Sequence, residues 1–363
     1  MSEIGDAIRA EFSRALAGGE VSKEQGVELL KGFVKRGMPA FHKMARGALT
    51  HDRKEHRGFV RRNIQRWREG FDALETLNAV CLAAGQEFQR EFLNHPPYVT
   101  DTLLGVLMRI HARSCRVSGE ILALMRDGYP DGAMSRWRSL HELALTALAL
   151  NHLGTPAAVD YYVCGKVKEL ELLHAYQASA EEMGYERHPD DFVRAAVSQV
   201  DELLKRNGRT AKDYNGQFGW INPYAEKAKG IDALRKLLGL QKWYHDYKWS
   251  SQEVHPVYKE MRTTLGMSEA SQDLLLAGPS NSAMTEPGHR SAIALAQATT
   301  AFITAYTKDE KSPLDDGATG YWIGLISELC DSVGQAFLAC EAKKPKRGLF
   351  GKTRWGKANP INK

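Results

Sequence analysis

Apolar residues recur along most of the chain at the spacing of an α-helix. The clearest run begins with Val60, Ile64, Trp67 and Phe71, which are four, three and four residues apart, and it keeps this register as far as Phe92. Such spacing places the apolar side chains on one face of a helix. The sequence therefore predicts one long amphipathic helix over this stretch, and no segment shows the alternation typical of a half-buried strand.

Turn and capping residues divide the following sequence into further helices. Thr100 or Asp101 can cap a helix that ends near Gly128, and Thr155 followed by Pro156 can open another. The helices predicted after the first one lie at about 101–127, 131–154, 156–184, 190–206, 230–248, 287–307 and 319–341, with two short helices before residue 35. The predicted fold class is all-α, a bundle of long antiparallel helices.

The chain divides into three predicted regions. Residues 1–95 form a helical N-terminal region with a basic amphipathic helix, and residues 96–341 form the helical core. Residues 342–363 combine glycine, proline and basic residues, which is typical of a disordered tail. Two segments without helical spacing, 207–229 and 266–289, are long enough to be functional loops, although either could be a packed connector.

The 363-residue chain is 43% hydrophobic, enough for a buried core, and its net charge of +5 conceals an uneven distribution. The stretch Lys35–Arg68 carries +9 and the stretch from Ala342 to the end carries +8, so the rest of the chain carries −12. The sequence predicts an acidic helical body with two basic segments. Charge concentrated in this way suits RNA or another polyanion, whose binding would weaken steeply with salt.

The first residues lack the basic and apolar regions of a secretory signal peptide. The longest apolar run, around Leu143–Leu150, is far shorter than the roughly 20 residues that span a bilayer. Five scattered cysteines with no C-x-x-C pair are typical of buried thiols in a reducing compartment. We therefore expect a cytoplasmic protein without a transmembrane segment.

The strongest concentration of reactive side chains lies in the helix predicted over 131–154. Arg138, His141 and Glu142 are three and four residues apart, so they share one face of that helix. Arg136 lies five residues before His141, about 500° of helical rotation, and faces elsewhere on a regular helix. The cluster has two interpretations: an intrahelical ion pair beside a partly buried histidine, or a catalytic site.

The catalytic interpretation draws on a resemblance. The pair Arg136-x4-His141 resembles the Arg-x(4–6)-His motif of the HEPN superfamily of helical ribonucleases and nucleotide-binding domains. The resemblance implies metal-independent RNA cleavage in a site shared by two subunits, with Arg136 stabilising the scissile phosphate and His141 acting as acid or base. These roles suit the side chains, because a guanidinium can bind phosphate through two hydrogen bonds and an imidazole exchanges protons near neutral pH.

A second resemblance covers roughly residues 100–340. The motif Arg138-Ser-Leu-x-Glu142, followed about a hundred residues later by Trp-Ser-Ser251-x3-His255-Pro, resembles the paired motifs of a bacterial helical family known only as a domain of unknown function. It implies that Arg138, Glu142, Ser251 and His255 meet in one polar site between helices. Ser251 and His255 can share a helix face, although a helix-terminal hydrogen bond would also explain His255.

Other catalytic classes find no support in the sequence. It contains no phosphate-binding glycine loop, no dinucleotide-binding glycine motif, and neither the zinc-protease motif nor the nucleophile motif of α/β-hydrolases. Glu171-x-x-His174 is half of a di-iron bundle motif, but Glu286-x-x-His289 runs through Pro287 and cannot project from a regular helix. We therefore expect neither a metal site nor a cofactor.

The basic segments also have two interpretations. Arginines on the outer faces of the first long helix are common on a solvated surface but also suit a nucleic acid. In the tail, Phe350 and Trp355 could stack on bases or lie on an anionic membrane, or the tail only keeps the protein soluble. The residues predicted to bind nucleic acid are Arg61, Arg62, Arg66, Arg68, Lys343, Lys344, Lys346 and Arg347.

Two functions are consistent with these patterns. The leading hypothesis is a HEPN-like, metal-independent endoribonuclease of toxin or phage-defence type, which implies a homodimer and a regulatory protein partner. Its site residues would be Arg136, His141, Arg138, Glu142, Ser251 and His255. The alternative is a non-catalytic helical module that binds nucleic acid or a partner protein through its basic segments, while the arginine–histidine–glutamate cluster only fixes helix packing.

Overall fold

The computed structural model describes residues 22–94, 101–225, 230–252, 264–269, 275–306 and 314–343, together with positions 10, 13, 14, 258 and 312. Every regular element in these residues is a helix, so the all-α fold predicted from the sequence is confirmed. Residue contacts divide the chain into two compact units, Met1–Arg62 and Asn63–Lys363. The sequence predicted a boundary at residue 95. The boundary between the two units lies earlier, because the helix that ends at Asn94 packs against helices of the second unit.

Helix α2 (Lys23–Arg66) is continuous where the sequence predicted two short helices and a separate longer one. Pro39 lies inside it and removes only one backbone hydrogen bond, which so long a helix tolerates. The backbone bends at Trp67 before α3 (Arg68–Asn94) begins, so the long helix predicted from residue 60 is in fact two helices. Backbone hydrogen bonds from Trp67 to Asn63 and from Phe71 to Trp67 continue across the bend.

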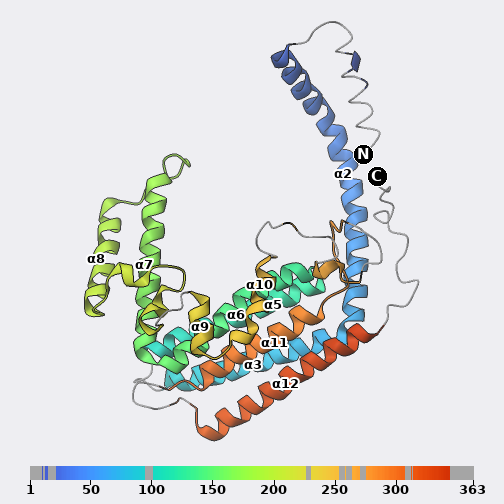
Figure 1. Cartoon of the computed structure of the whole chain (residues 1–363). Coiled ribbons are helices and arrows are strands. Elements are labelled where there is room, and N and C mark those ends of the chain that lie inside the picture. The colour runs from blue at the N-terminus through green and yellow to red at the C-terminus, as the bar shows by residue number, and fades with distance from the viewer. Residues whose placement is uncertain are drawn as a thin grey trace. The chain divides into compact units, whose positions relative to one another are not determined.

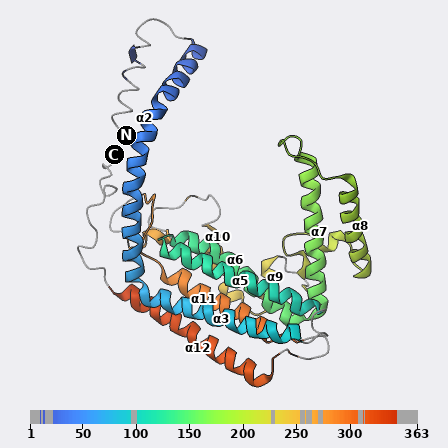
Figure 2. The ribbon, with the colours of Figure 1, turned by 180° about the vertical axis from the view of Figure 1, so that it is seen from behind.

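Five helices form the bundle of the second unit and lie side by side (Figure 1, Figure 2). They are α3, α5 (Thr102–Arg126), α6 (Pro130–Leu153), α11 (Thr285–Ile303) and α12 (Asp316–Ala342). Helix α11 contacts each of the other four. It can do so because small and apolar residues cover most of its circumference. Its buried residues include Ala292, Ala294, Leu295, Ala298, Ala301, Phe302 and Ile303.

Glycines on two helices make room for the ring of Phe337 on α12. A Cβ atom on Gly70 of α3 would lie 2.7 Å from this ring, and a Cβ atom on Gly288 of α11 would lie 2.4 Å from it. The ring also packs against Trp67 and Phe71, with ring-centroid separations of 6.1 and 5.9 Å. Helices α3, α11 and α12 therefore approach closely only because two positions carry no side chain.

Among the described residues, α12 is the one helix long and apolar enough, by length and composition, to cross a membrane. Of the most apolar 18-residue stretch of this helix, about 28% is buried. Its buried side chains Ile326, Val333, Phe337 and Cys340 face α3 and α11. Polar residues such as Ser327, Asp331 and Gln335 interrupt its sequence, so no uninterrupted apolar run marks this helix.

The segment after α7 (Thr155–Ser179) and α8 (Asp190–Arg206) is a packed connector. It forms two short 3₁₀ helices, η1 (Ala211–Tyr214) and η2 (Gly219–Tyr224), and both contact α7. The side chains of Tyr214, Trp220 and Ile221 are buried. Of the two interpretations of the loop at 207–229, the packed connector therefore describes residues 207–225.

The helix predicted over 230–248 is divided. It consists of α9 (Ile231–Leu237), η3 (Gln241–Trp243) and α10 (Tyr244–Gln252). Gly239 adopts a φ of 67°, a left-handed conformation that glycine reaches without strain and that ends α9. Helices α9 and α10 both contact α6, so the break brings two separate helices onto the helix that carries the predicted cluster.

Candidate functional site

The candidate site is a polar cluster on α6 where α9 and α10 contact it. The Tyr247 hydroxyl on α10 donates a hydrogen bond of 2.7 Å to Oε1 of Glu142. Nε of Arg138 donates to the same oxygen over 3.1 Å, and its guanidinium lies 4.6 Å from the centre of the Tyr247 ring. One carboxylate oxygen thus receives two donors, and the predicted pair Arg138–Glu142 is joined to a second helix.

Arg235 on α9 completes the surroundings of Tyr247. Its guanidinium lies 4.2 Å from the centre of the phenol ring, and Nη1 donates to Asp232 over 2.6 Å. The Arg235 side chain is only 2% exposed, so its cation–π contact is largely screened from water. Burial and the hydrogen bond to Glu142 raise the pKa of Tyr247 to about 12. Tyr247 therefore stays protonated and keeps donating to Glu142.

His141 lies deep in the cluster. Its ring stacks on Trp137, four residues earlier, with a centroid separation of 5.0 Å, and the side chain is 5% exposed. Burial, followed by the charges of Arg235 and Arg290, lowers the pKa of His141 to about 3. Nε2 has no hydrogen-bond partner among the described residues. At neutral pH the imidazole is therefore uncharged, and it is a weak base.

Arg136 points to a different neighbour. It forms an ion pair with Glu120 of α5, and Nη1 donates to the Ser139 hydroxyl over 3.4 Å. His141 packs instead against Trp137 and lies near Tyr247. The two residues of the Arg-x4-His motif are thus held by different helices, as the 500° of rotation between them predicts.

Ser251 lies one turn after Tyr247 on α10. Its hydroxyl donates over 2.7 Å to the backbone oxygen of Tyr247, and the buried hydroxyl of Ser250 donates to the same oxygen over 2.9 Å. His255 lies outside the described residues. The structure therefore joins Arg138 and Glu142 directly to α10, the helix that carries Ser251, and the hydroxyl of Ser251 bonds within its own helix.

Tyr247 and Arg235 were missed by the sequence analysis, although they are central to this cluster. A signal for Tyr247 existed, because it lies four residues before Ser251 and so shares its helix face. Arg235 gave no comparable signal, since it comes from a separate helix. Among the described residues, no group of three or more histidine, cysteine, aspartate or glutamate side chains is placed to hold a metal ion.

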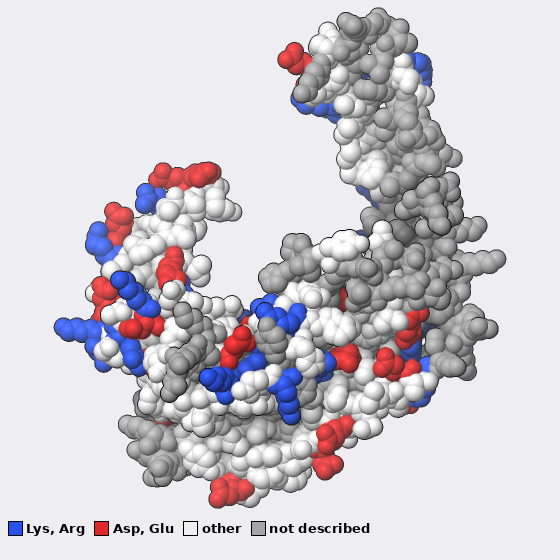
Figure 3. Space-filling model, viewed as in Figure 1, with Lys and Arg blue, Asp and Glu red and all other residues white. Residues whose placement is uncertain are grey.

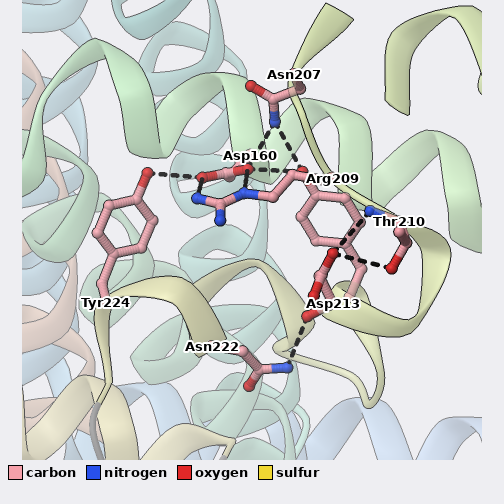
Figure 4. Close-up of polar contacts among 8 residues, drawn as sticks. Asp160, Asn207, Arg209, Thr210, Asp213, Asn222 and Tyr224 are labelled. Carbon is pink, nitrogen blue, oxygen red and sulfur yellow. Dashed lines mark hydrogen bonds and ion pairs between the residues drawn. The ribbon is translucent and has the colours of Figure 1, made fainter. Parts of the chain in front are cut away.

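A second polar cluster surrounds Asp160 of α7 (Figure 4). The carboxylate accepts hydrogen bonds of 2.6 Å from the Tyr214 and Tyr224 hydroxyls and one of 2.7 Å from Nδ2 of Asn207. Arg209 adds two longer contacts of 3.4 Å. The aromatic and asparagine-rich composition of the loop at 207–229 was the only sequence signal for this cluster.

The Asp160 cluster fastens the connector to α7. Burial alone would raise the pKa of Asp160, but the hydrogen bonds from Tyr214, Tyr224, Arg209 and Asn207 outweigh it and lower that pKa below its ordinary value. The carboxylate is 2% exposed, and its donors among the described residues all come from residues 207–224. We conclude that this cluster holds the end of α8, η1 and η2 in place.

The residues predicted to bind nucleic acid have different surroundings. In the first unit, Arg61 is exposed and Arg62 is half-buried. In the second unit, Arg68 is exposed, but Arg66 binds Glu269 over 2.5 Å and the Asn281 backbone oxygen over 2.7 Å. Lys343 pairs with Glu69 over 2.7 Å. Lys344, Lys346 and Arg347 lie outside the described residues, as does the rest of the tail.

The surface of the second unit carries charges of both signs. On the face shown in Figure 3, lysine and arginine side chains alternate with aspartate and glutamate over the bundle and over α7 and α8. A mixed face of this kind produces no extended positive field. Among the described helices, α2 carries the largest excess of one sign, with twelve lysine and arginine residues against four aspartate and glutamate residues.

Residues 104–272 match the sequence model of DUF5677, a family of unknown function. The matched stretch contains Arg138, Glu142 and Tyr247 as well as Asp160. It agrees with the resemblance to a family known only as a domain of unknown function. No curated protein and no solved structure shows a significant match to the chain.

Proposed function

We propose that the protein is a non-catalytic helical module that binds a polyanionic surface through α2. The observation that carries the proposal is the helical segment from Lys31 to Leu49, which contains no acidic residue. Its basic side chains are exposed, and a helix surface with such an excess of positive charge attracts anions. These side chains are Lys31, Lys35, Arg36, Lys43 and Arg46.

The α6 cluster supports a packing role in this proposal. Each arginine that surrounds His141 or Tyr247 has an acidic partner: Arg138 pairs with Glu142, Arg235 with Asp232 and Arg290 with Glu286. His141 is neutral and shielded from water. A catalytic acid or base needs a pKa near the working pH and access to a substrate. His141 meets neither requirement, because its pKa is about 3 and its side chain is 5% exposed.

A HEPN-like endoribonuclease remains the second candidate function. The observation in its favour is that Nε2 of His141 is buried without a hydrogen-bond partner among the described residues, in the field of Arg235 and Arg290. A bound phosphate would offset both positive charges and so raise the pKa of His141 towards neutrality. In this function, the same cluster would act in a homodimer, under control of a partner protein.

Binding of the full-length protein to immobilised heparin, measured against salt concentration, tests the first proposal. Binding that makes three cation contacts should weaken roughly 40-fold when the salt concentration rises about fourfold, because each contact releases counterions on binding and higher salt opposes that release. The variant K35Q/K43Q/R46Q should lose most of this dependence. The variant R194Q/K205Q/K236Q is the matched control, because it removes the same number of exposed positive charges from the second unit. Equal losses in both variants would contradict the proposal.

Incubation of the full-length protein with RNA in EDTA tests the second candidate. If the protein is a ribonuclease, cleavage should occur and should disappear in His141→Leu and in Arg136→Gln. Binding without cleavage supports the non-catalytic module. Cleavage that survives in both variants would show an activity located elsewhere and would contradict the assignment of the α6 cluster as its site.

A further inference from the structure

We infer that the stretch Val27–Leu49 of α2 is an interfacial helix that binds the surface of an anionic lipid bilayer. This inference rests on the proposed function and names the polyanion. It concerns the first unit alone, and it depends on two features of the same helical stretch: an exposed apolar face and an adjoining basic face on which Glu28 is the single acidic residue.

The apolar face consists of large side chains that the structure leaves exposed. Their exposed fractions range from 37 to 63%. At about 100° of rotation per residue, these side chains occupy an arc of roughly 140°. They are Val27, Leu30, Val34, Met38, Phe41, Met44 and Leu49. Single exposed apolar residues are ordinary on a protein surface, but a row this long along one helix marks a binding surface.

The basic face occupies the neighbouring arc, again of roughly 140°, from Lys31 to Arg36 around the helix. Lys35, Lys43 and Arg46 lie between these two in angle, and all five are exposed. Lys31 bonds Glu28, one turn earlier, over 2.7 Å, and no other acidic residue lies between Val27 and Leu49. A helix with an apolar side and a lysine- and arginine-rich side is the pattern of helices that lie in a membrane interface.

An anionic bilayer satisfies both faces of the helix at once. Its acyl chains would receive the apolar side chains of Val34 and Phe41, while phosphate and carboxylate headgroups would receive Lys35, Lys43 and Arg46. An RNA would engage only the basic face and leave the apolar row in water. A second copy of α2 could cover the apolar row, but its own segment 31–49 would add five more cations and no carboxylate. Charge complementarity therefore favours the lipid surface.

Co-sedimentation of the full-length protein with vesicles tests the inference. We expect binding to vesicles of phosphatidylcholine mixed with phosphatidylserine, and roughly tenfold or more weaker binding to phosphatidylcholine alone. The variant V34S/F41S should reduce vesicle binding by roughly tenfold or more but leave heparin binding unchanged. The variant K35Q/K43Q/R46Q should reduce both.

Matched variants in the second unit control for changes in overall polarity and charge. L172S/F192S removes two exposed apolar side chains from α7 and α8, and R194Q/K205Q/K236Q removes three exposed cations. Both should bind vesicles within about twofold of the natural chain. Thermal unfolding verifies that the α2 variants remain folded, since the altered side chains are exposed.

The outcomes separate the inference from the proposed function. Binding to heparin or RNA without binding to anionic vesicles would overturn the inference and leave the polyanion-binding function standing. If the protein binds neither heparin, nor RNA, nor anionic vesicles, both the inference and the proposed function are contradicted. A concentration-dependent dimer that V34S/F41S dissociates, with no vesicle binding, would assign the apolar row to a second copy of the chain instead.

Discussion

Tyr247 and Glu142 are 105 positions apart in the sequence, and a hydrogen bond of 2.7 Å between them joins α10 to α6. Oε1 of Glu142 also accepts a hydrogen bond from Arg138, its neighbour on α6. This one oxygen atom therefore joins the Arg138–Glu142 pair of α6 to Tyr247 of α10. The motif residues on α6 therefore have a function in packing that is visible in the structure: they hold α10, and with it Ser251, against the bundle.

Replacing Tyr247 with phenylalanine should destabilise this contact. The substitution removes the hydroxyl and leaves Glu142 with one fewer donor in a half-buried setting, which should lower the free energy of unfolding by about 1–2 kcal/mol. Urea denaturation monitored by tryptophan fluorescence measures this change. Tyr258→Phe is the control, because Tyr258 is fully exposed and its substitution should have no measurable effect. Equal stability of the two variants would contradict the packing role.

His141 should make the protein less stable in mild acid. Its pKa is about 3 in the folded chain, against an ordinary value of 6.5. Because the folded pKa is the lower one, the stabilising contribution is complete above about pH 6.5 and is lost as pH falls towards 3. From pH 7 to pH 5 this single group should cost about 2 kcal/mol.

Urea denaturation of His141→Leu at pH 7 and pH 5 measures this contribution. The difference in stability between the two pH values should be smaller in the variant by about 2 kcal/mol, whatever the substitution does to stability at pH 7. His174→Gln replaces an exposed histidine on α7 and serves as the control. An unchanged difference in His141→Leu would show that the imidazole is accessible to protons in the folded chain and would favour the ribonuclease.

Asp160→Asn should loosen the connector after α8. Tyr214 and Tyr224 donate to different oxygens of the carboxylate. Asparagine keeps only one acceptor oxygen, so one of these two hydroxyls would face an amide nitrogen that cannot accept its hydrogen bond. We expect a loss of about 3 kcal/mol in unfolding free energy, measured by urea denaturation at pH 7. Asp201→Asn is a control, because it alters an exposed aspartate on the neighbouring helix α8.

The effect of Asp160 should also depend on pH. Its folded pKa lies below its ordinary value, so its contribution is complete above that value and is lost as the pH falls through the folded pKa. The difference in stability between the natural chain and Asp160→Asn should therefore shrink when denaturation is repeated below about pH 4. A difference that stays constant down to pH 3 would contradict the charged state assigned to this carboxylate.

Gly288→Ala should force α11 and α12 apart. The new methyl group would lie 2.4 Å from the ring of Phe337, and the resulting strain should cost about 2–3 kcal/mol. Gly119→Ala on α5 is the matched control, because its methyl group would meet nothing within 4 Å and should stabilise the helix by about 0.5–1 kcal/mol. Adding Phe337→Leu to Gly288→Ala should recover part of the loss. Thermal or urea unfolding measures whether Gly288→Ala lowers the stability of the protein and whether Gly119→Ala raises it.

The helical fold could be predicted from the sequence because local information determines it. Apolar spacing, the Asp101 cap and the glycines at helix ends act within a few residues of the elements they specify. In the structure, the Asp101 side chain accepts from the Leu104 backbone over 3.0 Å, and Gly154 ends α6 with a φ of 75°. The predicted helix boundaries are wrong where two local signals compete. At Trp67 the apolar spacing continues through a bend, and at Gly239 one glycine divides a helix that the spacing predicts as continuous.

The sequence by itself determined the all-α fold, the shared face of Arg138, His141 and Glu142, and the concentration of positive charge in α2. Tertiary structure decided what surrounds these residues. Arg235, Tyr247 and Arg290 come from three separate helices. Burial of His141, followed by the charges of Arg235 and Arg290, lowers the pKa of His141 to about 3. Helical spacing fixes only the direction of a side chain, whereas protonation and pairing depend on partners that are distant in the sequence and become neighbours only when the helices pack.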